Sequence, residues 1–302
     1  MRYNHLPTER RHPRSHALDR LSPLRLVRLM NREDARLVRA VGRELPRIAR
    51  AIRVIAQTLR RGGRLVFVGA GTSGRLGVLE AAECPPTFHT TPSTVQALIA
   101  GGRGAVFRSR EGAEDRRAEA HDAVRAKVRR GDVVVGISAS GVTRFVDEAL
   151  KTARRRHART VLITCADRTT MPADVRIALS VGPELLTGST RLKAGTATKL
   201  VLNMLTLGAM AQCGKTYGNL MVDVRPTSRK LRARAVGIVR ALTGRSARAA
   251  VQRLRAAGGR VPVAVLMARR GLTRDEATRR LAASDGSLRR TLARHRLTHS
   301  LT

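Results

Sequence analysis

The chain has 302 residues and a formal net charge of +37, with 59 Lys and Arg against 22 Asp and Glu. Its three cysteines argue against a disulfide-linked scaffold and for a reducing compartment. No Cys or His spacing resembles a metal site, and no apolar run approaches the roughly 18 residues of a transmembrane helix. The Arg-rich N-terminus lacks the apolar core of a signal peptide. We therefore expect a cytoplasmic protein that binds neither a metal nor a membrane.

Residues 1–62 are predicted to form an arm followed by a long helix. The arm extends to about residue 32, and apolar residues then recur at helical spacing from Glu33 to Arg61. Pro46 falls inside this pattern, where we expect it to kink the helix.

The next segment, Arg64 to Phe88, predicts a phosphate-binding strand–turn–helix. Leu65–Val68 is a short apolar run typical of a buried strand, and an Ala- and Leu-rich helix is expected to end before Pro85. Between them lies a glycine-rich turn, where backbone N–H groups and the helix dipole suit an anion. The candidate ligands are Gly71, Thr72, Ser73 and Arg75.

The glycines at 69, 71 and 74 also fit the G-x-G-x-x-G fingerprint of dinucleotide sites. That fingerprint requires an acidic residue about 20 positions on, to hold the ribose hydroxyls. Residues 84–110 contain no Asp or Glu. The loop therefore favours a single phosphate over a nicotinamide or flavin, and we expect no cofactor.

A second unit of the same kind begins at Asp132. An apolar strand over 132–137 leads into the hydroxyl-rich loop 138–143 and then a helix to about residue 156. Parallel strands would place both loops at one edge of a sheet, where ligands of open α/β sheets bind. The candidates here are Ser138, Ser140 and Thr143, with ordinary helix N-capping as the alternative.

A third loop precedes another apolar helix. A strand over 176–181 is followed by a loop and by a helix from Thr196 to about Met210. Ser189, Thr190 and Lys193 would lie at this helix start, which favours anions. Arg75 and Lys193 could neutralise a phosphate, but solvation or pairing with neighbouring acids is equally compatible with the sequence.

Residues 226–302 are predicted to form a basic helical domain. From residue 229 onward there are 19 Lys or Arg against three acids, a net charge of +16. Two short helices are expected over 271–281 and 286–292, the first capped by Thr273 with Glu276 completing a capping box. Compositional drift toward Ala and Arg explains the charge without a specific partner, because aromatic stacking residues are nearly absent. We still expect non-specific polyanion binding at low salt.

The paired loops resemble those of a sugar isomerase (SIS) domain. Residues 69–77 together with Glu83–Phe88 resemble the bacterial N-acetylmuramic acid 6-phosphate etherases more specifically. The resemblance continues through Thr8–Ser15, Met30–Asp34, Leu98–Gly102, Glu111–Asp115, Thr187–Thr196 and Tyr217–Asp223. It implies an α/β fold with a parallel sheet flanked by helices, a flavodoxin-like three-layer sandwich. The SIS domain would span 63–225, the small helical domain 226–302, and the protein would be a homodimer.

The resemblance also implies a lyase that removes the D-lactyl ether from a sugar 6-phosphate. Glu83 matches the family's proton donor, and Glu114 matches its second catalytic carboxylate. At the expected helix end, the dipole and the apolar neighbours of Glu83 would favour its protonated form. For Glu114 the residues alone leave an alternative, an acid that stabilises the first turn of a helix running to about Lys127.

The chain departs from the family pattern in three regions. In the second loop Val142 and Arg144 stand where the family commonly has Arg and Pro. His12 and Glu80 replace the usual Asn and Asp. The related glucokinase regulatory proteins share parts of these motifs. A non-catalytic SIS sensor or a DNA-binding regulator is therefore the rival to the enzyme.

Overall fold

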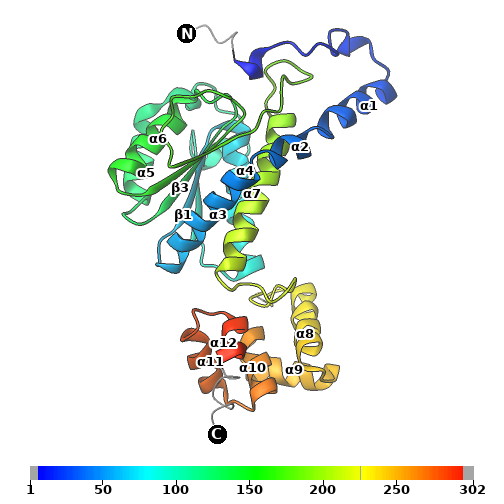
Figure 1. Ribbon diagram of the computed structural model, residues 1–302, viewed down its shortest axis with the longest axis vertical. Helices are drawn as coiled ribbons and strands as arrows, with labels where there is room; N and C mark the ends of the chain where they lie inside the picture. Colours follow the sequence, from blue (N-terminus) through cyan, green and yellow to red (C-terminus); the bar gives the residue numbers. More distant parts are fainter. Residues whose placement is uncertain (1–5, 225, 295–302) are drawn as a thin grey trace. The chain divides into compact units, whose positions relative to one another are not determined.

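The computed structural model describes residues 6–224 and 226–294, which form two compact units (Figure 1). The first unit contains the described residues up to Ala82 together with Pro92–Thr206. The second contains Glu83–Thr91 and the described residues from Leu207 onward. Two helices, α4 (Gly71–Phe88) and α7 (Lys193–Gln212), begin in the first unit, and their last turns count with the second.

The N-terminal part of the first unit is made of short helices. Two 3₁₀ turns, Pro7–Glu9 and Leu18–Arg20, precede α1 (Pro23–Asp34), α2 (Leu37–Gly42) and α3 (Leu45–Arg60). The expected single helix from Glu33 to Arg61 is wrong. Pro46 lies in the first turn of α3, where a missing N–H costs no hydrogen bond, so it begins a helix instead of kinking one.

A five-stranded parallel sheet forms the centre of this unit, in the order β2-β1-β3-β4-β5. The strands are β1 (Leu65–Gly69), β2 (Val95–Ile99), β3 (Val133–Ser138), β4 (Arg159–Thr164) and β5 (Val175–Ala178). All of β1 and β3 is buried, as the apolar runs predicted. The expected third strand is shorter, because β5 ends at Ala178 and not at Val181.

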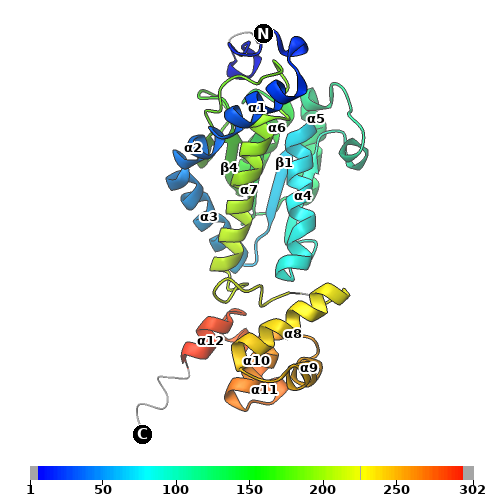
Figure 2. The ribbon, with the colours of Figure 1, turned by 90° about the vertical axis from the view of Figure 1, so that its right-hand side faces the viewer.

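Helices cover both faces of the sheet, which confirms the predicted three-layer α/β fold (Figures 1 and 2). On one face, Val66, Val68 and Val134 pack in a cluster with α5 (Arg117–Lys127) and α6 (Arg144–Arg155). The opposite face carries α3, α4 and α7. There the residues of β1 that alternate with Val66 and Val68 point toward α4, and Phe67 packs against Gly77.

Helix α4 does not end before the proline pair as expected, but continues through Pro85 and Pro86 to Phe88. Proline keeps a helical φ but lacks the N–H that bonds four residues back, and its ring crowds that carbonyl, so the pair lies where the helix is about to end. The helix stops at His89, whose φ is +53°, while its N–H still donates to the Pro85 carbonyl at 3.0 Å.

The second unit is built from α8 (Arg229–Thr243), α9 (Ala247–Ala256), α10 (Val261–Arg270), α11 (Arg274–Ala282) and α12 (Leu288–Arg294). Helix α10 is its core, because every residue from Val261 to Met267 is buried. The predicted capping box is confirmed. The Thr273 hydroxyl accepts from the Glu276 N–H at 3.3 Å, and the Glu276 carboxylate accepts from the Thr273 N–H at 2.9 Å.

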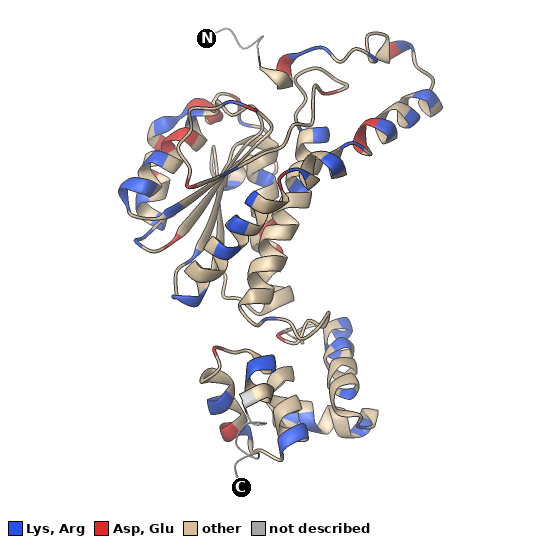
Figure 3. Ribbon diagram, viewed as in Figure 1, with Lys and Arg blue, Asp and Glu red and all other residues tan. Residues whose placement is uncertain are grey.

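Lys and Arg residues are distributed over the helices of both units (Figure 3). Within residues 6–224 and 226–294, no helix combines the length and the hydropathy needed to cross a bilayer.

Candidate active site

The two glycine- and hydroxyl-bearing loops emerge side by side from the carboxyl edge of the sheet. Strands β1 and β3 are direct neighbours, and the last residue of β1, Gly69, pairs with Ile137, one residue before the end of β3. Both following loops therefore start at the same level of the sheet. In a parallel α/β sheet this edge is where ligands bind.

In the first loop, the glycines allow the strand and the helix to touch. A Cβ on Gly74 would lie 2.7 Å from the Gly69 carbonyl oxygen, and one on Gly69 would lie 2.7 Å from the Gly74 nitrogen. Gly71 has a φ of +53°, which glycine adopts without strain. The half-buried Thr72 and Ser73 hydroxyls make no hydrogen bond within the described residues, so they are available to a ligand.

The second loop is held by its own hydroxyl groups. The Ser138 Oγ donates to Thr143 Oγ1 at 2.9 Å and accepts from the Gly141 N–H at 3.2 Å. Ser140 Oγ accepts from the Val142 N–H at 3.4 Å. Thr143 is the N-cap residue of α6, yet its side chain makes no capping hydrogen bond. The capping alternative therefore does not account for Thr143.

Glu114 lines a small cavity beside the first loop. The cavity, of about 130 Å³, is also lined by Gly71 and Arg75, and the Arg75 Nε donates to the Val106 carbonyl at 2.9 Å. Although Glu114 is partly exposed, burial raises the pKa of its carboxyl group, and the charges of Asp115 and Glu111 raise it further.

Glu114 is not a first-turn helix acid. It lies in the 3₁₀ turn Ala113–Asp115, ahead of α5, and the acid in the first turn of α5 is Glu119. The structural alternative to catalysis is therefore not supported for Glu114.

Glu83 belongs to the second unit, in the part of α4 that precedes the proline pair. Its side chain is exposed, so the apolar surroundings expected from Pro85 and Phe88 do not enclose it within the single chain. The adjacent Cys84 is 2% exposed, so its thiol is buried.

The helix start that follows the third loop already holds an anion of the chain. The Glu184 carboxylate accepts the N–H groups of Lys193 and Ala194 at 3.0 and 2.9 Å, so the chain supplies its own anion at the start of α7. Burial raises the pKa of Glu184, although these two hydrogen bonds oppose the shift. Ser189 and Thr190 are half-buried in the segment before this helix.

Lys193 pairs with an acid of the chain, which is the alternative to phosphate neutralisation that the sequence left open. Its Nζ lies 3.1 Å from Oε2 of Glu33, and both side chains are at most 4% exposed. The same carboxylate lies 3.1 Å from Nε2 of His12, whose Nδ1 accepts from the Arg14 N–H at 3.2 Å. An accepting Nδ1 places the proton on Nε2, which donates to Glu33.

Sequence reasoning missed this buried cluster of His12, Glu33 and Lys193. Burial acts to raise the pKa of Glu33, but hydrogen bonds from Lys193 and His12 and their charges lower it overall. Glu33 lies 160 positions from Lys193, so no local spacing signals the pair.

The substituted Glu80 has a structural role. It is 5% exposed, its Oε2 accepts from Thr206 Oγ1 at 2.8 Å, and its Oε1 pairs with Lys199. It therefore ties α4 to α7 behind the first loop. Within the described residues, no three His, Cys, Asp or Glu side chains are arranged to hold a metal ion.

The fold and the paired loops define a sugar isomerase (SIS) domain protein. Residues 115–208 match the SIS domain family, and residues 47–154 match the N-terminal SIS domain of glucokinase regulatory protein. A phosphoheptose isomerase from Francisella tularensis has the same fold, with a TM-score of 0.51 and 14% identity over 63% of this chain and 100% of that chain.

The whole chain also has much more similar relatives. N-acetylmuramic acid 6-phosphate etherase of Trichormus variabilis is 50% identical over 97% of this chain and 96% of its own length. The corresponding proteins of Synechocystis and Symbiobacterium thermophilum are 48% and 49% identical over 95% and 88% of this chain. The chain therefore belongs to the N-acetylmuramic acid 6-phosphate etherase family, which confirms the resemblance found in its motifs.

Proposed function

We propose that the chain cleaves the D-lactyl ether of N-acetylmuramic acid 6-phosphate, releasing D-lactate and N-acetylglucosamine 6-phosphate. The observation that carries the proposal is the pair of loops at one sheet edge, in a chain about half identical to etherases along nearly its whole length. The first loop offers the Thr72 and Ser73 hydroxyls and the N-terminus of α4 to a phosphate. The second loop adds Ser138, Ser140 and Thr143.

The chemistry is an elimination followed by an addition. In the ring-opened sugar the proton on carbon 2 is acidic because it is adjacent to the aldehyde, and the ether oxygen on carbon 3 is β to that carbonyl. A base removes the carbon 2 proton, the carbon 3–oxygen bond breaks, and an acid protonates the departing lactate oxygen. Water then adds to carbon 3, carbon 2 regains a proton, and both carboxyl groups return to their starting states.

We assign the acid to Glu83 and the second acid/base role to Glu114. The raised pKa of Glu114 supports its assignment, because a carboxyl group that exchanges protons near neutral pH needs such a shift. The assignment of Glu83 rests on its place in the family motif.

Released D-lactate, measured with purified protein and N-acetylmuramic acid 6-phosphate, tests the function. We expect turnover by the wild type, none by Glu83→Gln, and a large loss in Glu114→Gln. Asp275→Asn is the control for removing an exposed acid in the second unit. In D₂O the sugar product should carry one deuterium at carbon 2. Full turnover by either glutamine variant would remove that residue from the mechanism.

The pH profile tests Glu114 separately. Because the Asp115 charge raises the pKa of Glu114, Asp115→Asn should lower it and move the Glu114-dependent limb of kcat/KM to lower pH. A limb that does not move would show that a group other than Glu114 titrates there.

Binding of the sugar phosphate without release of lactate would instead support the non-catalytic sensor.

We further propose that the protein is a cytoplasmic homodimer, on the basis of the family and of cysteines without disulfide bonds among the described residues. Light scattering after size exclusion tests the dimer. Non-specific polyanion binding should appear as DNA retention that salt abolishes. Retention that is independent of salt would contradict a purely electrostatic origin.

A further inference from the structure

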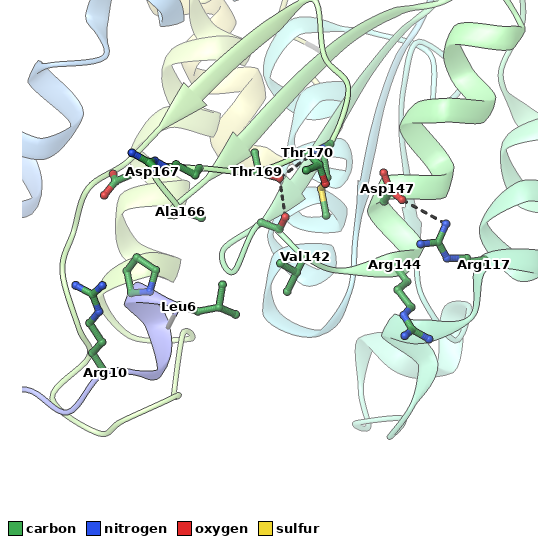
Figure 4. Close-up of a pocket in the computed structure, with 14 residues that line it drawn as sticks. Leu6, Arg10, Arg117, Val142, Arg144, Asp147, Ala166, Asp167, Thr169 and Thr170 are labelled. Atoms are coloured by element: carbon green, nitrogen blue, oxygen red, sulfur yellow. Dashed lines mark hydrogen bonds and ion pairs between the residues drawn. The ribbon is translucent and has the colours of Figure 1, made fainter. Parts of the chain in front are cut away.

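A large cavity in the first unit is not used by the proposed reaction (Figure 4). Its volume is about 970 Å³, and four segments line it. They are the N-terminal stretch from Leu6 to Arg10, the start of α5 at Arg117, the end of the second loop with the start of α6, and the segment 166–171 after β4. Part of its wall therefore belongs to the second loop.

Four guanidinium groups line this cavity, and only two are matched by carboxylates. Nη1 of Arg117 lies 3.3 Å from Oδ2 of Asp147, and Nε of Arg144 lies 3.6 Å from Oδ1 of Asp115. The other two, on Arg10 and Arg168, form no ion pair in the part of the chain that the structure describes.

Within the described residues, the unpaired guanidinium groups of the wall suit an anion. Asp147 and Asp115 neutralise Arg117 and Arg144, which leaves the guanidinium groups of Arg10 and Arg168 and the carboxylate of Asp167. Oδ1 of Asp167 accepts from the Ser180 Oγ at 2.6 Å, which ties that carboxylate to the residues that follow β5. Guanidinium groups bind phosphate oxygens with well-directed, charge-assisted hydrogen bonds.

The middle of the cavity is apolar. Figure 4 shows Arg10 on one side, Arg117 and Arg144 on the other, and Leu6 and Val142 between them. A ligand that fills this space therefore carries an uncharged body next to its anionic group.

This cavity is separate from the substrate-binding groups proposed above. Gly141 and Val142 line it, whereas the hydroxyl residues of the same loop do not. Glu114 lines the other cavity, beside the β1 loop and the segment after β2, whereas this one lies beside the β3 and β4 ends. The residues proposed to bind the substrate phosphate and to act on carbons 2 and 3 therefore do not line this cavity.

We propose that this cavity binds a second small phosphate monoester, with its dianion held by Arg10 and Arg168 and its uncharged body against Leu6 and Val142. Because Val142 belongs to the second loop, the occupied cavity and the substrate site would change each other's affinity by the same factor. The binding does not depend on the proposed etherase activity.

Calorimetric titration with N-acetylglucosamine 6-phosphate, glycerol 3-phosphate and inorganic phosphate tests the site. The wild type should bind two molecules of the sugar phosphate per chain. Both esters should bind the cavity at least about tenfold more tightly than inorganic phosphate, because contacts between the uncharged body and the apolar wall need to contribute only about 1.4 kcal/mol for that difference. Arg10→Gln with Arg168→Gln should weaken the cavity site by about 100-fold, at about tenfold for each lost charge-assisted contact.

Two matched variants keep the result interpretable. Arg50→Gln with Arg53→Gln removes two exposed charges from α3, outside the cavity, and should leave both binding events unchanged. Thr72→Ala with Ser73→Ala should weaken only the substrate site. If the double variant Arg10→Gln with Arg168→Gln binds the esters as tightly as the α3 control does, the proposal is wrong. Inorganic phosphate binding as tightly as the esters would overturn the role of the apolar wall.

Discussion

Replacing Glu33 by Gln tests whether the buried cluster holds the first unit together. Glu33 is 2% exposed and lies 3.1 Å from both the Lys193 Nζ and the His12 Nε2. The substitution keeps the shape but leaves the Lys193 ammonium without its carboxylate in a site where its side chain is 4% exposed.

Breaking a buried ion pair from one side typically costs about 3–5 kcal/mol. Glu184 interacts electrostatically with Lys193 and compensates part of its charge, which places the expected loss near the lower end, about 3 kcal/mol. Asp115→Asn, which removes a half-exposed partner of Arg144, should cost no more than about 1 kcal/mol. The double variant Glu33→Gln with Lys193→Met removes both charges and should recover much of the loss.

The difference in unfolding free energy between the wild type and Glu33→Gln should also depend on pH. Since the pKa of Glu33 is lowered in the folded state, its contribution is fully present above the unfolded value near 4.5 and is lost as the pH falls through the lower folded value. The gap between wild type and Glu33→Gln should therefore be constant from neutral pH to about pH 5 and shrink below about pH 4.

Urea unfolding followed by far-UV circular dichroism measures the free energy of unfolding. Because the chain has two units, amide hydrogen exchange on peptides from β1 and from α10 shows which unit is affected. A loss below about 1 kcal/mol at pH 7, equal to that of the Asp115 control, would refute the argument from burial.

Three further predictions concern packing, capping and reactivity. Gly77→Ala should destabilise the first unit by about 1–3 kcal/mol in urea unfolding, because the new Cβ would lie 2.8 Å from a side-chain carbon of β1. Gly237→Ala in α8 meets nothing within 4 Å and should stabilise by about 0.5–1 kcal/mol; a matching loss would refute the packing argument. Thr273→Ala should cost about 1 kcal/mol, seen as faster hydrogen exchange in α11. Burial raises the pKa of Cys165 to about 12, so mass spectrometry should find it unmodified by iodoacetamide at pH 8 in the folded protein, and rapid alkylation would contradict this.

The strand–loop–helix units could be predicted from sequence because their signals are local. In Arg64–Phe88, about 25 residues hold all the signals of one unit. These are a short apolar run, glycines that let the strand touch the following helix, and hydroxyl residues after the strand. The capping box at Thr273 is equally local, since all its partners lie within four positions. The etherase family followed from motifs of the same local kind.

Long-range contacts decided the rest. Local periodicity could not show that Glu184 occupies the start of α7, or that Lys193 pairs with Glu33. Each depends on which segment the fold brings into contact, and a buried charge takes whichever partner lies within hydrogen-bonding distance, however distant in the chain. The sequence alone determined the two loops and the glycine and hydroxyl residues that they carry. Only the tertiary structure decided which charged groups are bound within the protein and which remain available to a ligand, because that depends on desolvation and packing between distant segments.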